Sequence, residues 1–115
     1  MNRIILTLLL LAVAKVVVAQ DQIIIKPAFW WSDMKNTQLQ LMVSGQDISR
    51  FKPQVTYDKI KIQDIVIVDN PNYLFIYLDI NGAEPGNFDI TFTKGNERIT
   101  YNYELRPRRE KAADV

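Results

Sequence analysis

Residues 73–80 read Tyr-Leu-Phe-Ile-Tyr-Leu-Asp-Ile, and this stretch decides the fold. Every second position, from Leu74 to Ile80, carries an aliphatic side chain, and aromatic or acidic side chains stand between them. Because successive side chains of a strand point to opposite faces, the pattern predicts a strand that buries one face. Turn residues precede it at Asn70-Pro71-Asn72 and follow it at Asn81-Gly82. The stretch is therefore predicted to be one strand between two turns.

The same alternation recurs along the chain, whereas helical periodicity is absent. It predicts further strands at 39–43, 54–57, 60–67, 88–92 and 99–105, after a short β-branched run at 23–25. The alternation slips in phase near Asp64, which predicts a β-bulge there. Residues 94–97 are interpreted as a hairpin loop, and residues 27–34 as a loop.

This spacing predicts the fold class. About seven short strands, with turn signals every eight to twelve residues or so, are typical of an all-β, immunoglobulin-like antiparallel β-sandwich. A small β-barrel is the alternative architecture. The 115 residues suffice for one domain and are too few for a TIM barrel of about 250 residues.

Composition excludes several kinds of chemistry. The chain has no cysteine and no histidine, so disulfides, thiol nucleophiles, imidazole bases and Cys/His zinc sites are impossible. A net charge of +1 gives no electrostatic case for nucleic acid. The carboxylates are scattered and stand mostly beside turns, where Asp is ordinary. We therefore expect no catalytic residue, no metal site and no cofactor.

The N-terminal residues are typical of a signal peptide. A basic start is followed by an apolar run over 4–14, and the small residues Val17 and Ala19 suit a cut before Gln20. The run is too short to span a membrane. We expect a cleaved signal at 1–19, export to the periplasm or cell exterior without membrane attachment, and a sandwich domain at 20–105.

The stretch Phe29-Trp30-Trp31 holds both tryptophans of the chain. Flat aromatic faces stack on sugar rings, so Phe29, Trp30, Trp31 and the nearby Met34 are candidates for carbohydrate or domain contact. Adjacent residues in extended chain point opposite ways, so one tryptophan is expected to be structural and the other exposed. The aromatic residues between 73 and 77 are interpreted as the outer face of a strand, since β propensity favours them there.

Two segments together carry a family resemblance. Residues 27–36, Pro-Ala-Phe-Trp-Trp-Ser-Asp-Met-Lys-Asn, and residues 39–45, Leu-Gln-Leu-Met-Val-Ser-Gly, resemble the N-terminal β-sandwich of cyclomaltodextrinase and neopullulanase-like enzymes. These enzymes belong to the α-amylase superfamily, glycoside hydrolase family 13, and the most similar form is common in secreted or periplasmic Bacteroidetes enzymes. Residues 69–80, 85–92 and 101–106 fit the same domain, so the resemblance covers about 21–109.

The resemblance implies a non-catalytic accessory domain of a secreted α-glucan-degrading glycosidase. In that family the sandwich packs on a (β/α)8 catalytic barrel, and in some members it contributes to a homodimer and to the rim of an active site. The implied partners are that barrel and maltooligosaccharide or cyclodextrin. The sequence reaches Val115 before any barrel residue, so no catalytic residue carries over, and the chain alone is expected not to be an enzyme.

The last ten residues differ in composition from the strands. Residues 106–115 are expected to be a charged linker leading to a missing catalytic domain, which makes the chain a truncated or detached piece. The alternative function is that of a free-standing exported β-sandwich that binds a protein partner.

Overall fold

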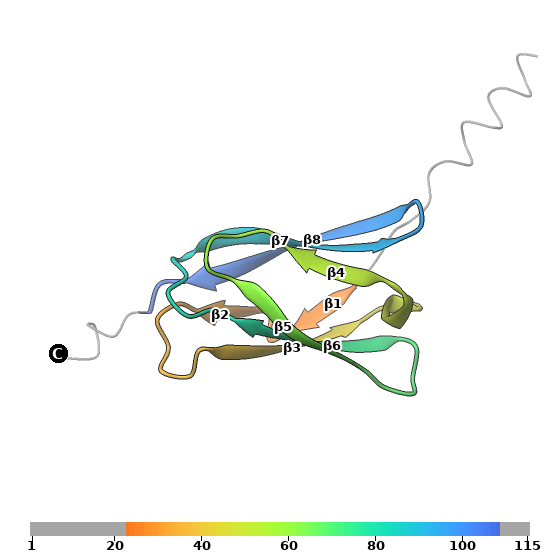
Figure 1. Cartoon of the computed structure of the whole chain (residues 1–115), viewed down its shortest axis with the longest axis horizontal. Helices are drawn as coiled ribbons and strands as arrows, with labels where there is room; N and C mark the ends of the chain where they lie inside the picture. The colour runs from red at the N-terminus through yellow and green to blue at the C-terminus, as the bar shows by residue number, and fades with distance from the viewer. Residues whose placement is uncertain (1–22, 109–115) are drawn as a thin grey trace, which may run out of the picture.

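The computed structural model describes residues 23–108, which form two β-sheets packed face to face (Figure 1). The first sheet has the strand order β1-β3-β6-β5. Its strands are β1 (Ile24–Lys26), β3 (Gln38–Ser44), β6 (Tyr73–Asp79) and β5 (Lys61–Ile67). The second sheet has the order β2-β8-β7-β4. Its strands are β2 (Phe29–Trp31), β8 (Glu97–Arg106), β7 (Gly86–Lys94) and β4 (Lys52–Val55), and a 3-10 helix, η1, covers Ile48–Arg50.

The connectivity is that of an immunoglobulin-like sandwich. Across the first sheet, β1, β3, β6 and β5 take the places of strands A, B, E and D, and in the second sheet β4, β7 and β8 take those of C, F and G. The predicted fold class is thus confirmed, and the barrel alternative is wrong because the two sheets remain separate.

The first edge strand is split between the sheets at Pro27. Pro27 has no N–H to donate, so it cannot continue the β1 ladder, and the chain crosses to the other sheet. Residues 29–31 then form β2, which pairs in parallel with β8. The prediction of a loop over 27–34 was therefore wrong for Phe29–Trp31. Three residues are too few to show an alternation, and the partner strand lies at the far end of the sequence.

Other predictions from alternation are confirmed. The β5–β6 register shifts between Ile62 and Asp64, which is the predicted bulge. β7 and β8 meet at a two-residue turn after Lys94, where Gly95 has a φ of 60°, a left-handed conformation that favours glycine. The strand predicted at 54–57 instead covers Lys52–Val55, and Pro53 is tolerated because β4 is an edge strand.

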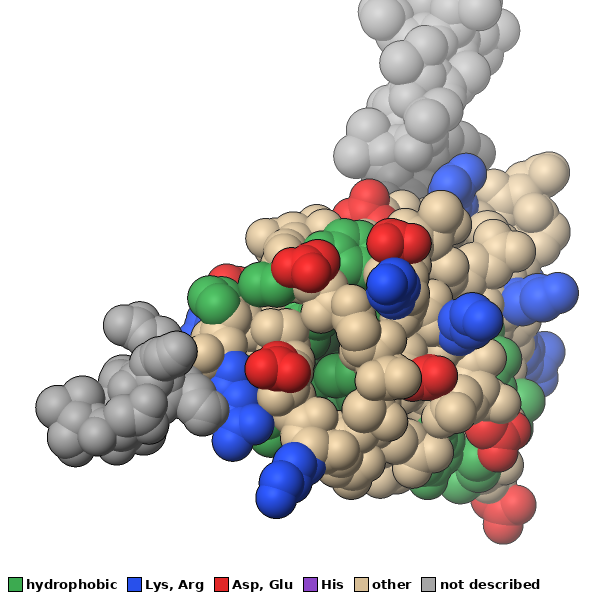
Figure 2. All heavy atoms as spheres, turned by 60° about the vertical axis from the view of Figure 1, so that its left-hand side comes forward, with side chains coloured by type: hydrophobic (Ala, Val, Ile, Leu, Met, Phe, Trp, Pro, Cys, Tyr) green, Lys and Arg blue, Asp and Glu red, His purple; other side chains and the backbone are tan. Residues whose placement is uncertain are grey.

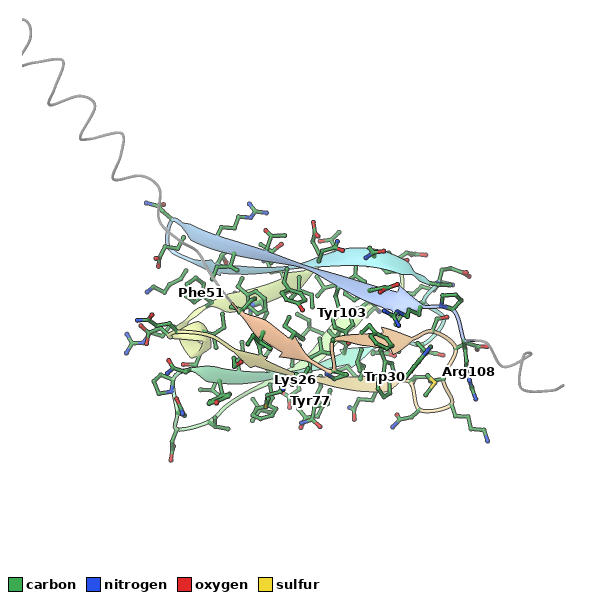
Figure 3. All side chains as sticks on the ribbon, turned by 180° about the vertical axis from the view of Figure 1, so that it is seen from behind. Lys26, Trp30, Phe51, Tyr77, Tyr103 and Arg108 are labelled. Atoms are coloured by element: carbon green, nitrogen blue, oxygen red, sulfur yellow. The ribbon has the colours of Figure 1, made fainter. Side chains whose placement is uncertain are left out.

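The core lies between the sheets and is built from the inward rows of the strands. Its fully buried side chains include Leu41, Val43, Leu74, Ile76, Leu78, Ile90, Phe92 and Tyr103. Tyr103 points into the space between the sheets (Figure 3), and its hydroxyl donates a hydrogen bond to the carbonyl of Pro27 at 2.9 Å. This bond ties β8 to the residue at which the chain changes sheets.

No helix found within residues 23–108 is both long enough and apolar enough to cross a bilayer.

Candidate functional site

The side chains of β2 alternate between the core and the outer face of the second sheet. Trp30 lies opposite Leu105 of β8, and both point inward, where Trp30 is half-buried against the core. Phe29 and Trp31 lie opposite Glu104 and Arg106, so they are on the outer face of the second sheet. Trp31 is 36% exposed. The structure therefore places Trp30 against the core and Trp31 at the surface, with their ring centroids 5.3 Å apart.

Phe29, Trp31 and Arg106 form a group of side chains in contact, which we name the aromatic cluster. The rings of Phe29 and Trp31 meet edge to face, with centroids 5.2 Å apart at 82°. The guanidinium carbon of Arg106 lies 3.4 Å from the centroid of Phe29, which is cation–π distance. Arg106 Nε also lies 3.0 Å from Glu104 Oε1. An exposed ion pair of this kind adds little stability.

Two hydrogen bonds to backbone carbonyls join the chain after β2 to the end of β8. The Ser32 N–H donates to the carbonyl of Arg106 at 2.8 Å, and Arg108 Nη1 donates to the carbonyl of Asp33 at 3.1 Å. Trp30 and Arg108 lie at the same end of the sandwich (Figure 3). Met34 lies half-buried in the loop after β2, outside the ring contacts of the cluster. Arg106 was predicted to begin the linker, but it is the last residue of β8.

The charge at this end of the molecule is mixed. Figure 2 shows acidic and basic side chains interspersed here, with hydrophobic side chains between them. Within residues 23–108, no group of three or more acidic side chains is placed to hold a metal ion. The predicted linker beyond Arg108 and the predicted signal at 1–19 lie outside the described residues.

A polar groove of about 450 Å³ lies on the second sheet and was not foreseen from the sequence. Two side-chain hydrogen bonds order its floor. Asn102 Nδ2 donates to Asp89 Oδ1 at 3.1 Å, and Asn87 Nδ2 donates to Asn102 Oδ1 at 2.8 Å. The signal that could have found it is the pair Asn87 and Asp89, which alternate with buried residues of β7 and stand opposite β8.

Fold and surface together define a class: an immunoglobulin-like β-sandwich module with an aromatic cluster and a polar groove on its second sheet. Residues 24–109 match the family described as cyclomaltodextrinase, N-terminal. The chain therefore belongs to the family of cyclomaltodextrinase N-terminal domains, as its resemblance implied, and the match covers the whole sandwich. This is an accessory, non-catalytic domain of glycosidases, and the 115 residues hold no catalytic barrel.

Proposed function

We propose that this chain is the N-terminal accessory domain of an exported, α-glucan-degrading glycosidase, packs on a (β/α)8 catalytic domain and contacts the glucan itself. Family membership supports the association with a glycosidase. The observation that carries the glucan contact is the aromatic cluster, in which Trp31 is exposed on the outer face.

The cluster suits a sugar for two reasons. The apolar C–H face of a pyranose packs on a flat aromatic surface such as the indole of Trp31. Arg106, held by Phe29 and Glu104, presents guanidinium N–H groups beside that surface and can donate to sugar hydroxyls. Because the cluster adjoins the end of β8, a glucan stacked on Trp31 would lie close to Arg108, which donates to the carbonyl of Asp33.

The experiment is calorimetric titration of the domain with maltoheptaose. Trp31→Ala is expected to weaken binding by about tenfold, equivalent to about 1.4 kcal/mol, because the stacking surface is removed. The matched control is Tyr73→Ala, an equally exposed aromatic residue (36%) on the first sheet, which should leave binding unchanged. Absence of binding both to maltoheptaose and to a catalytic domain of this family, supplied separately, would overturn the proposed function.

A second candidate function is that of a sandwich that binds a protein partner. The edge strand β5 and the residue after it favour it, because they expose four consecutive apolar side chains, Ile65, Val66, Ile67 and Val68. Unpaired edge strands are templates for pairing with another chain. Under this alternative Ile67→Lys would abolish partner binding, whereas Trp31→Ala would not affect it.

A further inference from the structure

We propose that the outer face of the second sheet is one continuous oligosaccharide-binding face, in which the aromatic cluster and the polar groove are neighbouring subsites. The inference deepens the proposed function and rests on it for the choice of an α-glucan as ligand.

The pairing register places cluster and groove on one face. Phe29 lies opposite Glu104 of β8, and Glu104 lies opposite Asn87 of β7, so these three side chains form one row across three strands. The next outward row holds Asp89 opposite Asn102. The alternate row, Phe88 opposite Tyr103, points into the core and is buried.

The groove has the volume of a small-ligand site, and its lining is more polar than is usual for one. Its volume of about 450 Å³ falls in the roughly 300–1,000 Å³ range of such sites. The polar side chains of its lining that would contact the ligand are Gln54, Asn87, Asp89, Thr91, Arg98 and Asn102. They come from β4, β7 and β8, so three neighbouring strands of a rigid sheet hold them.

The chemistry of this lining favours hydroxyl groups. A sugar hydroxyl both donates and accepts, so adjacent hydroxyls need donors and acceptors side by side. Each amide has two N–H donors and a carbonyl, and a carboxylate accepts several bonds, so the chain from Asn87 through Asn102 to Asp89 keeps capacity for a ligand. The single charges of Asp89 and Arg98 oppose each other, which suits a neutral ligand rather than an anion.

The dimensions favour a chain of sugars over a single one. Neighbouring strands lie about 4.8 Å apart, so the face from β2 to β4 extends over roughly 14 Å. The aromatic cluster at β2 offers stacking, and the groove over β7, β8 and β4 offers hydrogen bonds. One oligosaccharide spanning both would use two kinds of contact that neither subsite supplies alone.

The test is titration of the protein chain with maltoheptaose and with maltose. Asn102→Ala and Trp31→Ala are each expected to weaken maltoheptaose binding by about tenfold, whereas maltose, which reaches one subsite, should respond to only one of them. Gln40→Ala, an exposed amide on the first sheet, is the matched control and should change nothing. Thermal unfolding of each variant checks the fold, and Asn87→Ala serves as a second groove variant.

The outcomes separate the two proposals. Weaker binding in Trp31→Ala with unchanged binding in both Asn102→Ala and Asn87→Ala would overturn the shared face and leave the proposed function standing. Tighter binding of a sulfated oligosaccharide than of maltoheptaose would overturn the assignment to neutral glucan. If the unaltered chain bound neither maltoheptaose nor a catalytic domain of this family, both proposals would be overturned.

Discussion

Ile76→Ala is expected to lower the free energy of unfolding by about 2–5 kcal/mol. Ile76 has no exposed surface and lies in the middle of β6, between Leu41 of β3 and Ile65 of β5. β6 is an interior strand paired on both sides, so the surrounding backbone cannot easily move in to fill the cavity. Since small domains are stable by about 5–15 kcal/mol, this change removes a large share of the total.

The matched control is Ile67→Ala, the same chemical change on the adjacent strand β5. Ile67 is 61% exposed, so its removal leaves no cavity and should shift stability by less than about 0.5 kcal/mol. Urea unfolding followed by circular dichroism measures both midpoints. Equal shifts in the two variants would contradict the assignment of Ile76 to the core and of Ile67 to an open edge.

Tyr103→Phe is the second large effect, expected to cost about 1–3 kcal/mol. The variant keeps the buried ring but removes the hydroxyl that donates to the carbonyl of Pro27, leaving that acceptor without this partner. Because Pro27 joins β1 to β2, the lost bond also loosens the strand that carries Phe29 and Trp31. Urea unfolding measures the cost, and Tyr73→Phe, at an exposed tyrosine, is the control.

The same residue predicts how stability depends on pH. Burial, and secondarily the charge of Tyr101, raises the pKa of Tyr103 well above its ordinary value of 10.0. In the unfolded chain this phenol loses its proton near that value, whereas the folded protein retains it. Above about pH 10 the unfolded state therefore binds fewer protons, and the free energy of unfolding falls as pH rises. Below that pH the contribution is fully present.

Tyr103→Phe should flatten this alkaline decline, because phenylalanine has no proton to lose. The measurement is the urea midpoint at a series of pH values from about 8 to about 11. The Tyr73→Phe protein should follow the unaltered chain over the whole series. Parallel curves for all three proteins would show that Tyr103 does not cause the decline.

Much of the sandwich was predictable from local alternation. The strand at 73–80, the slip near Asp64 and the turn after Lys94 each follow from neighbouring residues, because a strand's side chains alternate whatever its partner is. The same rule predicts that only one of Trp30 and Trp31 faces the core. These features need no knowledge of which strands lie side by side.

Only the tertiary structure could show that β2 is a strand, because its ladder depends on β8 at the other end of the chain. The same holds for the shared face of Phe29 and Asn87, and for the groove around Asn102. Alternation predicts which residues of one strand share a face. Which strands are neighbours, and in what register, depends on how both sheets bury their apolar rows against each other.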